Sequence, residues 1–168
     1  SLPNMTHVTD VYANSKGRPV TICDFSPPRA ANHAVVEQVR DLTPDFISVA
    51  YSPGKAVRVD SAFMALALKL AVKKEVVFNL ACRDANKLML QNHLLGASML
   101  GLDNVLVLKG DNFTDKDLET VKSVDDYTPT RLIKGIKKLN QGEDYRGLKI
   151  RTPTNFCIGA TVDLGRPI

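Results

Sequence analysis

The sequence predicts an α/β fold in which helices cover a parallel sheet, and three observations lead to this prediction. Five short apolar runs alternate along the chain with four segments whose apolar residues recur at helical spacing. The runs are almost continuously apolar, as in strands that are covered on both faces. The 168 residues are 44% hydrophobic and 24% charged, which is typical of one soluble globular domain.

Two layouts of a parallel sheet fit this alternation, an open doubly wound sheet and a (β/α)₈ barrel. A complete barrel usually needs about 200–250 residues, so a chain of 168 residues favours the open sheet on length alone. The residues at the strand ends have to decide between the two layouts.

The first strand and helix follow a polar stretch. Residues 1–19 show no sustained periodicity, so we expect an N-terminal arm or capping segment there. Residues 20–25 predict a strand, and the proline pair that begins at Pro27 ends it because proline cannot donate a ladder hydrogen bond. A helix is expected from Asn32, whose side chain suits an N-cap, to about Leu42.

The middle of the chain repeats the pattern. Residues 46–50 predict the second strand, which the Ser-Pro-Gly sequence at 52–54 ends. Residues 61–72 are rich in Ala, Leu and Met and predict the second helix. Residues 76–81 predict the third strand, and a third helix is expected over 86–100.

The last units are also well delimited. Gly101 is placed to end the third helix at its C′ position. Residues 105–108 predict the fourth strand. After a polar loop, Thr128 and the proline that follows it predict the start of a helix reaching about Leu139. Residues 156–162 predict the fifth strand.

Composition excludes several classes of function. The net charge of +4 arises from 22 cations mixed with 18 anions, the chain has no Trp, and only 6% of its residues are aromatic. A nucleic-acid surface with base-stacking side chains is therefore not expected. The chain contains no apolar run of about 20 residues and no signal-peptide pattern at its start, so we expect neither a membrane span nor secretion.

The cysteines and histidines suggest no metal or disulfide chemistry. Cys23, Cys82 and Cys157 are odd in number and lie in apolar segments, which predicts reduced thiols in a cytoplasmic protein. The three histidines lie far apart in the sequence and outside the strand ends, so we expect no metal site.

Polar residues recur where the predicted strands end. In a parallel α/β fold the chemistry gathers at the C-terminal ends of the strands, so repeated carboxylates there indicate a polar pocket with acid–base or cofactor-tuning roles. The residues at these ends are Asp24, Tyr51, Arg83, Asp84, Asp111 and Asp163. A Gly-x-Gly-x-x-Gly fingerprint, a complete P-loop and a recognisable Ser-His-Asp triad are all missing.

Four segments, in order, resemble the methylenetetrahydrofolate reductase family. They are Cys23–Arg29 (CDFSPPR), Cys82–Asn86 (CRDAN), Asn104–Asp111 (NVLVLKGD) and Phe156–Asp163 (FCIGATVD). The resemblance covers roughly residues 20–163 and rests on the four segments together.

The resemblance implies a (β/α)₈ barrel that binds FAD at the C-terminal face of its strands. It implies reduction of 5,10-methylenetetrahydrofolate to 5-methyltetrahydrofolate, a step of one-carbon metabolism and methionine biosynthesis. Electrons would come from NADH, NADPH or another donor and pass through the flavin, and a carboxylic acid would assist opening of the folate ring.

The resemblance also implies roles for particular residues. Asp24 falls where the family usually has a Glu as general acid, so its carboxyl lies one methylene closer to the backbone. Asp111 falls on the family's Asp beside flavin and folate. The implied cofactor-binding residues are Ala50, Tyr51, Pro53, Asn79, Lys109, Gly110, Asp111, Ala160 and Val162.

The extent of the match leaves alternatives open. The sequence stops after the fifth expected strand, so residues 20–168 would be the N-terminal part of a barrel that lacks three further units. The chain is then a truncated piece or the ordered part of a longer protein, or a half-barrel that a partner chain or a second copy completes, and activity of the 168-residue chain alone is left open. Two other hypotheses are a non-catalytic or regulatory half-barrel subunit and an unrelated open-sheet binding protein.

Overall fold

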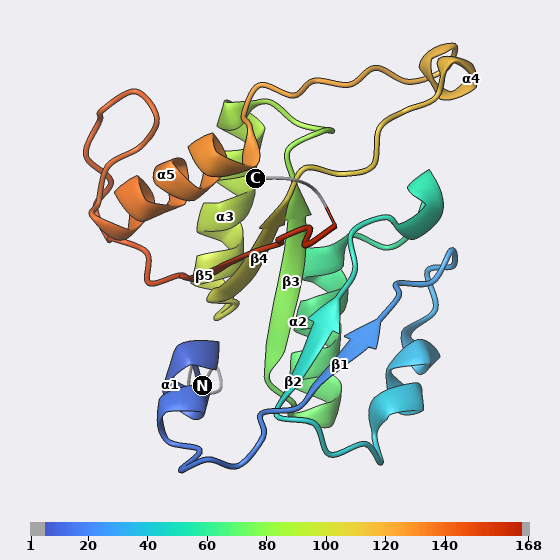
Figure 1. The fold of residues 1–168 in the computed structure, drawn as a ribbon, viewed down its shortest axis with the longest axis vertical. Coiled ribbons are helices and arrows are strands. Elements are labelled where there is room, and N and C mark those ends of the chain that lie inside the picture. Colours follow the sequence, from blue (N-terminus) through green and yellow to red (C-terminus); the bar gives the residue numbers. More distant parts are fainter. Residues whose placement is uncertain (1–5, 166–168) are drawn as a thin grey trace.

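The computed structural model describes residues 6–165, and its central feature is one sheet of five parallel strands (Figure 1). The strands are β1 (Ile22–Phe25), β2 (Phe46–Val49), β3 (Val76–Ala81), β4 (Asn104–Leu108) and β5 (Cys157–Ala160). The α-helices are α1 (Val8–Ala13), α2 (Ser61–Val72), α3 (Lys87–Met99), α4 (Asp115–Leu118) and α5 (Pro129–Asn140). Two 3₁₀ helices are η1 (His33–Val39) and η2 (Pro53–Lys55).

The strand order decides between the two predicted layouts. The strands lie side by side in the order β1-β2-β3-β4-β5, and every neighbouring pair is parallel. A doubly wound sheet would reverse its order at a switch point, whereas a barrel adds each strand to the same side of the one before it. The sheet is therefore of the (β/α)₈ type, as predicted, and over the described residues it does not close.

The two faces of the sheet differ sharply. Alternate side chains of the strands pack under α2, α3, α5 and η1 to form the hydrophobic core. The largest fully buried side chains of this core include Ile47 and Phe78 from the strands and Leu94 and Leu132 from the helices. The other face mixes polar side chains such as Ser48 and Asn79 with apolar ones such as Val77 and Leu106, and these share one side because their strands pair in register. This face corresponds to the inner face of a barrel, and it extends to the C-terminal ends of the strands.

Capping side chains start the helices where the sequence predicts them. Asn86 accepts a hydrogen bond from the Met89 amide, and Thr128 accepts one from the Arg131 amide. Asn32 caps the first segment as expected, but that segment is the 3₁₀ helix η1 rather than an α-helix. Gly101 ends α3 with a φ of +78°, a backbone conformation that costs glycine no steric strain.

The polar N-terminal residues contain a helix that periodicity did not predict. α1 lies against the N-terminal ends of the strands, where the Asn104 side chain accepts from the Val8 amide and donates to the Thr6 carbonyl. The imidazole Nε2 of His7 lies 2.6 Å from the Asn155 carbonyl oxygen. These partners are far away in the sequence, so α1 is held by tertiary contacts and not by its own periodicity.

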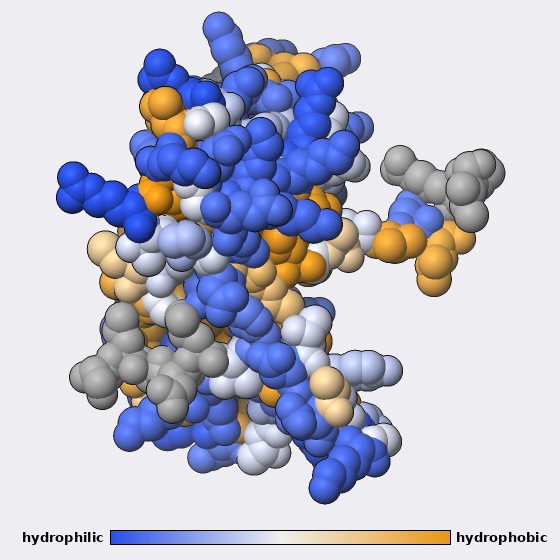
Figure 2. All heavy atoms as spheres, turned by 90° about the vertical axis from the view of Figure 1, so that its left-hand side faces the viewer, coloured by the Kyte–Doolittle hydropathy of each residue, from blue (hydrophilic) through white to orange (hydrophobic). Residues whose placement is uncertain are grey.

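The outer surface is strongly polar over α5. Figure 2 shows hydrophilic side chains across much of this side of the molecule, where Arg131, Lys134, Lys137 and Lys138 are exposed. Their opposite helix face buries Leu132 and other apolar side chains, so α5 is amphipathic as its spacing predicts. Within residues 6–165, no helix has the length and apolar character needed to cross a membrane.

Candidate functional site

The C-terminal ends of β4 and β5 border an open polar cavity of about 540 Å³. Lys109, Gly110 and Asp111 line it from the turn after β4, and Thr161 and Asp163 line it from the segment after β5. The structure thus brings together two of the strand-end acids that the sequence singled out. Both reach the same cavity because the two strands are parallel neighbours.

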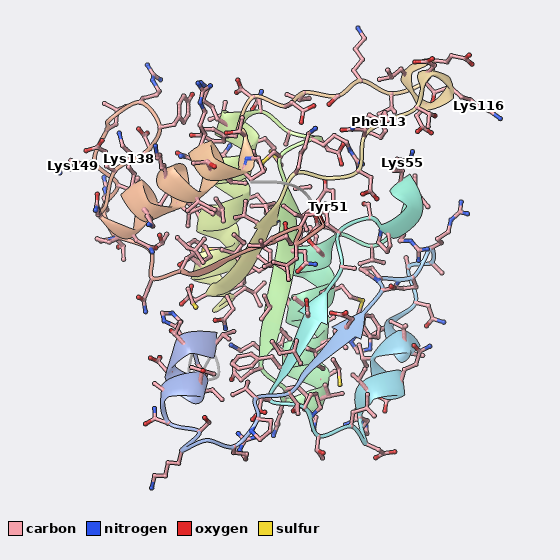
Figure 3. All side chains as sticks on the ribbon, viewed as in Figure 1. Tyr51, Lys55, Phe113, Lys116, Lys138 and Lys149 are labelled. Carbon is pink, nitrogen blue, oxygen red and sulfur yellow. The ribbon has the colours of Figure 1, made fainter. Side chains whose placement is uncertain are left out.

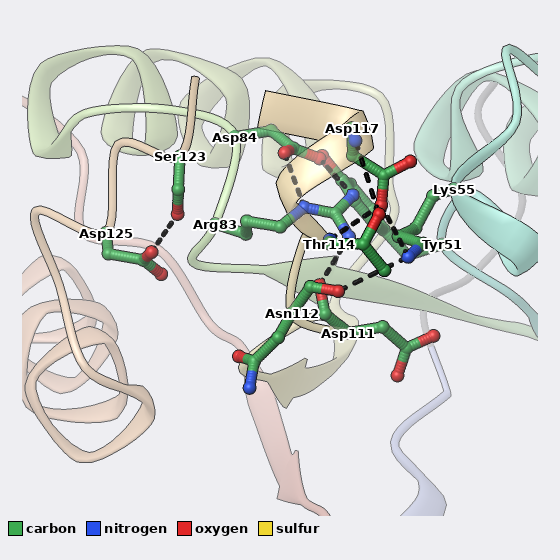
Figure 4. A network of polar contacts seen from close by, with 10 residues as sticks. All are labelled: Tyr51, Lys55, Arg83, Asp84, Asp111, Asn112, Thr114, Asp117, Ser123 and Asp125. Carbon is green, nitrogen blue, oxygen red and sulfur yellow. Dashed lines mark hydrogen bonds and ion pairs between the residues drawn. The ribbon is translucent and has the colours of Figure 1, made fainter. Parts of the chain in front are cut away.

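A buried arginine links the turn after β4 to the end of β3 (Figure 4). The Arg83 guanidinium makes a two-pronged ion pair with Asp84, with Nε–Oδ1 at 2.7 Å and Nη2–Oδ2 at 2.8 Å. Its Nη1 donates to the backbone carbonyl of Asp111 at 2.9 Å. The Phe113 ring lies 4.2 Å from the guanidinium carbon, within cation–π range.

The end of β2 joins the same network through a tyrosine. The Tyr51 hydroxyl donates to Asp84 Oδ2 at 2.7 Å. The hydrogen bonds from Arg83 lower the pKa of Asp84. Burial and the bond to Asp84 together raise the pKa of Tyr51, so this phenol stays protonated at neutral pH. One carboxylate therefore ties together residues that follow two adjacent strands.

The turn after β4 needs a glycine at position 110. Gly110 has a φ of +91°, and a Cβ there would lie 3.1 Å from Arg83 Cβ and 3.4 Å from Ala81 Cβ. A larger residue would strain the backbone and crowd the arginine. This glycine therefore lets the turn lie against Arg83, and Asp111 follows directly at the cavity.

The segment after β4 is fastened a second time by a lysine from η2. Lys55 Nζ lies 2.7 Å from Asp117 Oδ2 and 3.3 Å from the Asn112 carbonyl oxygen. Asp117 also forms a reciprocal capping box with Thr114 at the start of α4. The bond from Lys55 and those from Thr114 lower the pKa of Asp117 to about 2. Figure 3 shows Lys55, Tyr51 and Phe113 toward the same upper end of the sheet.

Asn79 lies on the inner face of β3, one strand away from that turn. Its side-chain oxygen accepts a hydrogen bond from the Ser48 hydroxyl at 3.3 Å, and its backbone carbonyl accepts one from Ser61 at 2.7 Å. Among the described residues no acceptor engages its amide nitrogen. The side chain is therefore partly fixed and keeps a donor free on the inner face.

Asp24 lies apart from the other acids. It is exposed on β1, opposite Ser48 of β2. β2 and β3 separate β1 from β4, which puts the two strands about 14 Å apart at ordinary strand spacing along a flat sheet. The structure therefore places Asp24 on the same wall as Asp111 but not beside it.

The remaining candidates differ in exposure. Ala50 is half-buried, and Pro53 begins η2, where its carbonyl accepts from Arg58 Nε at 3.0 Å. Ala160 is exposed and Val162 is 78% exposed, so neither is core packing in the described chain. Contact with a ligand stays a prediction for all four residues.

The sequence did not single out Lys55 or Phe113, and it noted Arg83 without a role. The signal for Arg83 and Asp84 was their place directly after a strand. No sequence signal indicated that Lys55 reaches Asp117, because 62 positions separate the two residues.

Comparison with known proteins agrees with this geometry. Residues 9–151 match a family model described as methylenetetrahydrofolate reductase. The match covers most of the chain. The match includes β1 to β4, the Arg83 network and the turn that carries Asp111. A search of curated proteins finds no match.

Proposed function

The chain belongs to the methylenetetrahydrofolate reductase family, and from that premise we propose that it reduces 5,10-methylenetetrahydrofolate to 5-methyltetrahydrofolate with FAD as its cofactor. Family membership makes the chain a folate-related oxidoreductase. The observation that carries the finer proposal is the Asp111 carboxylate, which borders the cavity on a turn that two other loops hold in place.

The residues present suit a flavin at the strand ends. The cavity is open and mostly polar, and Lys109 at its border offers a cation for an anionic part of the cofactor. Asn79 keeps an amide donor free for a flavin carbonyl, and Ala50 offers a small side chain directly after the neighbouring strand β2. These side chains lie in or directly after three neighbouring strands, so they are placed to contact one extended ligand together.

Two acids of this chain would have separate tasks. A bound flavin would supply the reducing equivalents for the methylene carbon of the folate. The Asp111 carboxylate would stabilise the cationic character that develops on the folate. Asp24 would hold the proton needed at the folate nitrogen, and its exposed position leaves it free to contact a substrate.

Two further assignments are part of the proposal. NADH or NADPH would reduce the cofactor, as the family resemblance implies. We also place the protein in the cytoplasm, and the free state of Cys23, Cys82 and Cys157 supports a reducing compartment.

The test is a half-reaction on the purified protein. A visible spectrum with flavin bands should show the cofactor, and anaerobic mixing with NADH or NADPH should bleach them. Adding methylenetetrahydrofolate should restore the bands and yield 5-methyltetrahydrofolate, detected by mass. Protein that carries reduced flavin but is not reoxidised by the folate would contradict the proposal.

A further inference from the structure

We propose that Arg83 is a positioning residue for Asp111, and that Asp84 is the counter-ion that leaves the Asp111 carboxylate free to act. The inference deepens the proposed function and rests on it, because it explains how the carboxylate assigned there is presented. Neither residue touches the cavity in its own right, so both act through Asp111.

The first step of the argument is how completely Arg83 is held. The residue is only 5% exposed. Its backbone carbonyl accepts from the Val124 amide at 2.7 Å, which ties it to the far end of the loop after β4. Its guanidinium holds Asp84 through two nitrogens and the Asp111 carbonyl through the third. A planar fork with all three nitrogens engaged has little freedom to turn.

The second step is what Arg83 does not contact. Its bond to Asp111 goes to the backbone carbonyl, and its ion pair goes to Asp84. Among residues 6–165 the Asp111 side chain has neither an ion pair nor a hydrogen bond. The arginine thus fixes the backbone of Asp111 while the carboxylate points elsewhere (Figure 4).

The third step is charge. An unpaired guanidinium would weaken the negative potential of the exposed Asp111 carboxylate, because the two charges interact through space. Asp84 neutralises the guanidinium, and the Tyr51 hydroxyl fixes Asp84 by a bond at 2.7 Å. The guanidinium charge is therefore paired with Asp84, while the same arginine fixes the backbone of Asp111.

The first variant separates position from charge. Arg83→Lys keeps the cation but loses the fork, so it can no longer hold Asp84 and the Asp111 carbonyl together. We expect amide exchange over residues 109–113 to quicken. In the holoenzyme, kcat for reoxidation by methylenetetrahydrofolate should fall at least tenfold, with KM changed less than threefold.

An arginine–carboxylate pair at the other end of the sheet provides the control. Arg18 makes a two-pronged contact with Asp45 through Nη1 and Nη2, at 3.0 and 2.8 Å, before β1 begins, and it lies on the surface. Arg18→Lys should leave both the exchange over 109–113 and the reoxidation rate unchanged. The positioning role is refuted if Arg83→Lys keeps the wild-type rate. It is also refuted if the drop in activity is no larger than the drop in the amount of folded protein.

The second variant tests the counter-ion through a double-mutant cycle. Asp84→Asn leaves Arg83 without its charge partner, so the flavin midpoint potential should rise and folate-dependent reoxidation should slow at least fivefold. In an Asp111→Asn background, Asp84→Asn should slow folate-dependent reoxidation less than twofold, because the Asp111 carboxylate is already absent. Effects that simply multiply would overturn the counter-ion role.

The design also separates this inference from the proposed function. If wild-type protein does not turn over methylenetetrahydrofolate, the proposed function fails. The positioning role is then tested only by the amide exchange over residues 109–113. Faster exchange over 109–113 in Arg83→Lys than in Arg18→Lys would then support it, and equal exchange would refute it.

Discussion

At the scale of single residues, the site depends on where charge is neutralised and where it is not. Arg83, Asp84 and Tyr51 satisfy one another in a partly buried cluster, whereas Asp111 extends from a fixed backbone with its carboxylate unpaired among the described residues. Asp111 is exposed, so solvent receives its charge in this structure, and the contrast shows which of these carboxylates is free to meet a ligand.

Replacing Asp111 by Asn should harm catalysis more than folding. Asn keeps the shape and one acceptor but removes the charge that we assign to the folate cation. Flavin should still bind, while reoxidation by methylenetetrahydrofolate falls about tenfold or more, equivalent to about 1.4 kcal/mol of barrier. Stopped-flow absorbance measures the rate, and the melting temperature reports the fold.

Asp163→Asn is the control for that change, because Asp163 borders the same cavity from the segment after β5. Asp163→Asn should slow reoxidation less than threefold if the effect depends on the particular position of Asp111 and not on any negative charge near the cavity. An unchanged rate in Asp111→Asn would remove this residue from the mechanism.

The thiol of Cys82 should be the slowest of the three to react. Burial, helped by the charge of Asp125, raises its pKa to about 11 from an ordinary value of 9.0. At pH 8 this leaves about a hundredfold less thiolate, the reactive form. Native protein should therefore show two fast thiols and one slow thiol with a disulfide reagent. Denatured protein without reductant should show three, and a count of one would mean that a disulfide exists.

At the scale of elements, the short helix α4 depends on a contact far away in sequence. Four residues are too few for a helix to be stable alone, so the capping box and the Lys55–Asp117 ion pair must hold it. The same contacts hold the loop that carries Asp111. Without these contacts, α4 would not be connected to the turn that carries Asp111.

This contact predicts how the segment responds to acid. The folded pKa of Asp117 is depressed to about 2 from 3.8, so its stabilising effect is present above pH 4 and is lost as the pH falls through 2. Cleavage of residues 109–126 by pepsin should therefore increase between pH 4 and pH 2 more steeply than the activity of the protease itself.

Pepsin should cut the Asp117→Asn variant quickly from pH 4 to pH 2, because Lys55 no longer has a carboxylate partner. Asp115→Asn, which changes another acid of the first turn of α4, should behave like wild type. A wild-type profile in Asp117→Asn would show that the ion pair does not hold the segment.

At the scale of the whole molecule, the sheet is a barrel wall with open edges. Within the described chain β1 pairs only with β2, and β5 pairs only with β4. The inner face, with side chains such as Ser48 and Leu106, borders an apolar hollow of about 230 Å³ above α1. Open strand edges pair readily with other chains.

The 168-residue polypeptide expressed alone should therefore self-associate. Sedimentation velocity at micromolar concentration should show dimers or larger species, and the amides of β5 should be protected from exchange in them. A compact monomer of about 18.4 kDa with fast-exchanging β5 amides would contradict this expectation.

The amino-acid sequence by itself determined the five strands, the three long helices and the edge of the sheet where acidic residues gather. α2 and β3 have the predicted bounds, and Asn32, Asn86 and Thr128 cap the segments that they were expected to start. Apolar periodicity and capping are local properties, so a single sequence reveals them. Acids that directly follow strands are visible for the same reason, because parallel strands share one functional end.

Only the tertiary structure decided how those elements combine. The strand order confirmed the barrel that the family resemblance implied, against the open sheet that length alone favoured. α1 and α4 exist through partners such as Asn104 and Lys55, and Arg83 meets the backbone of a residue 28 positions away. Such contacts depend on which segments lie side by side in space, and neither propensity nor spacing along the chain encodes that.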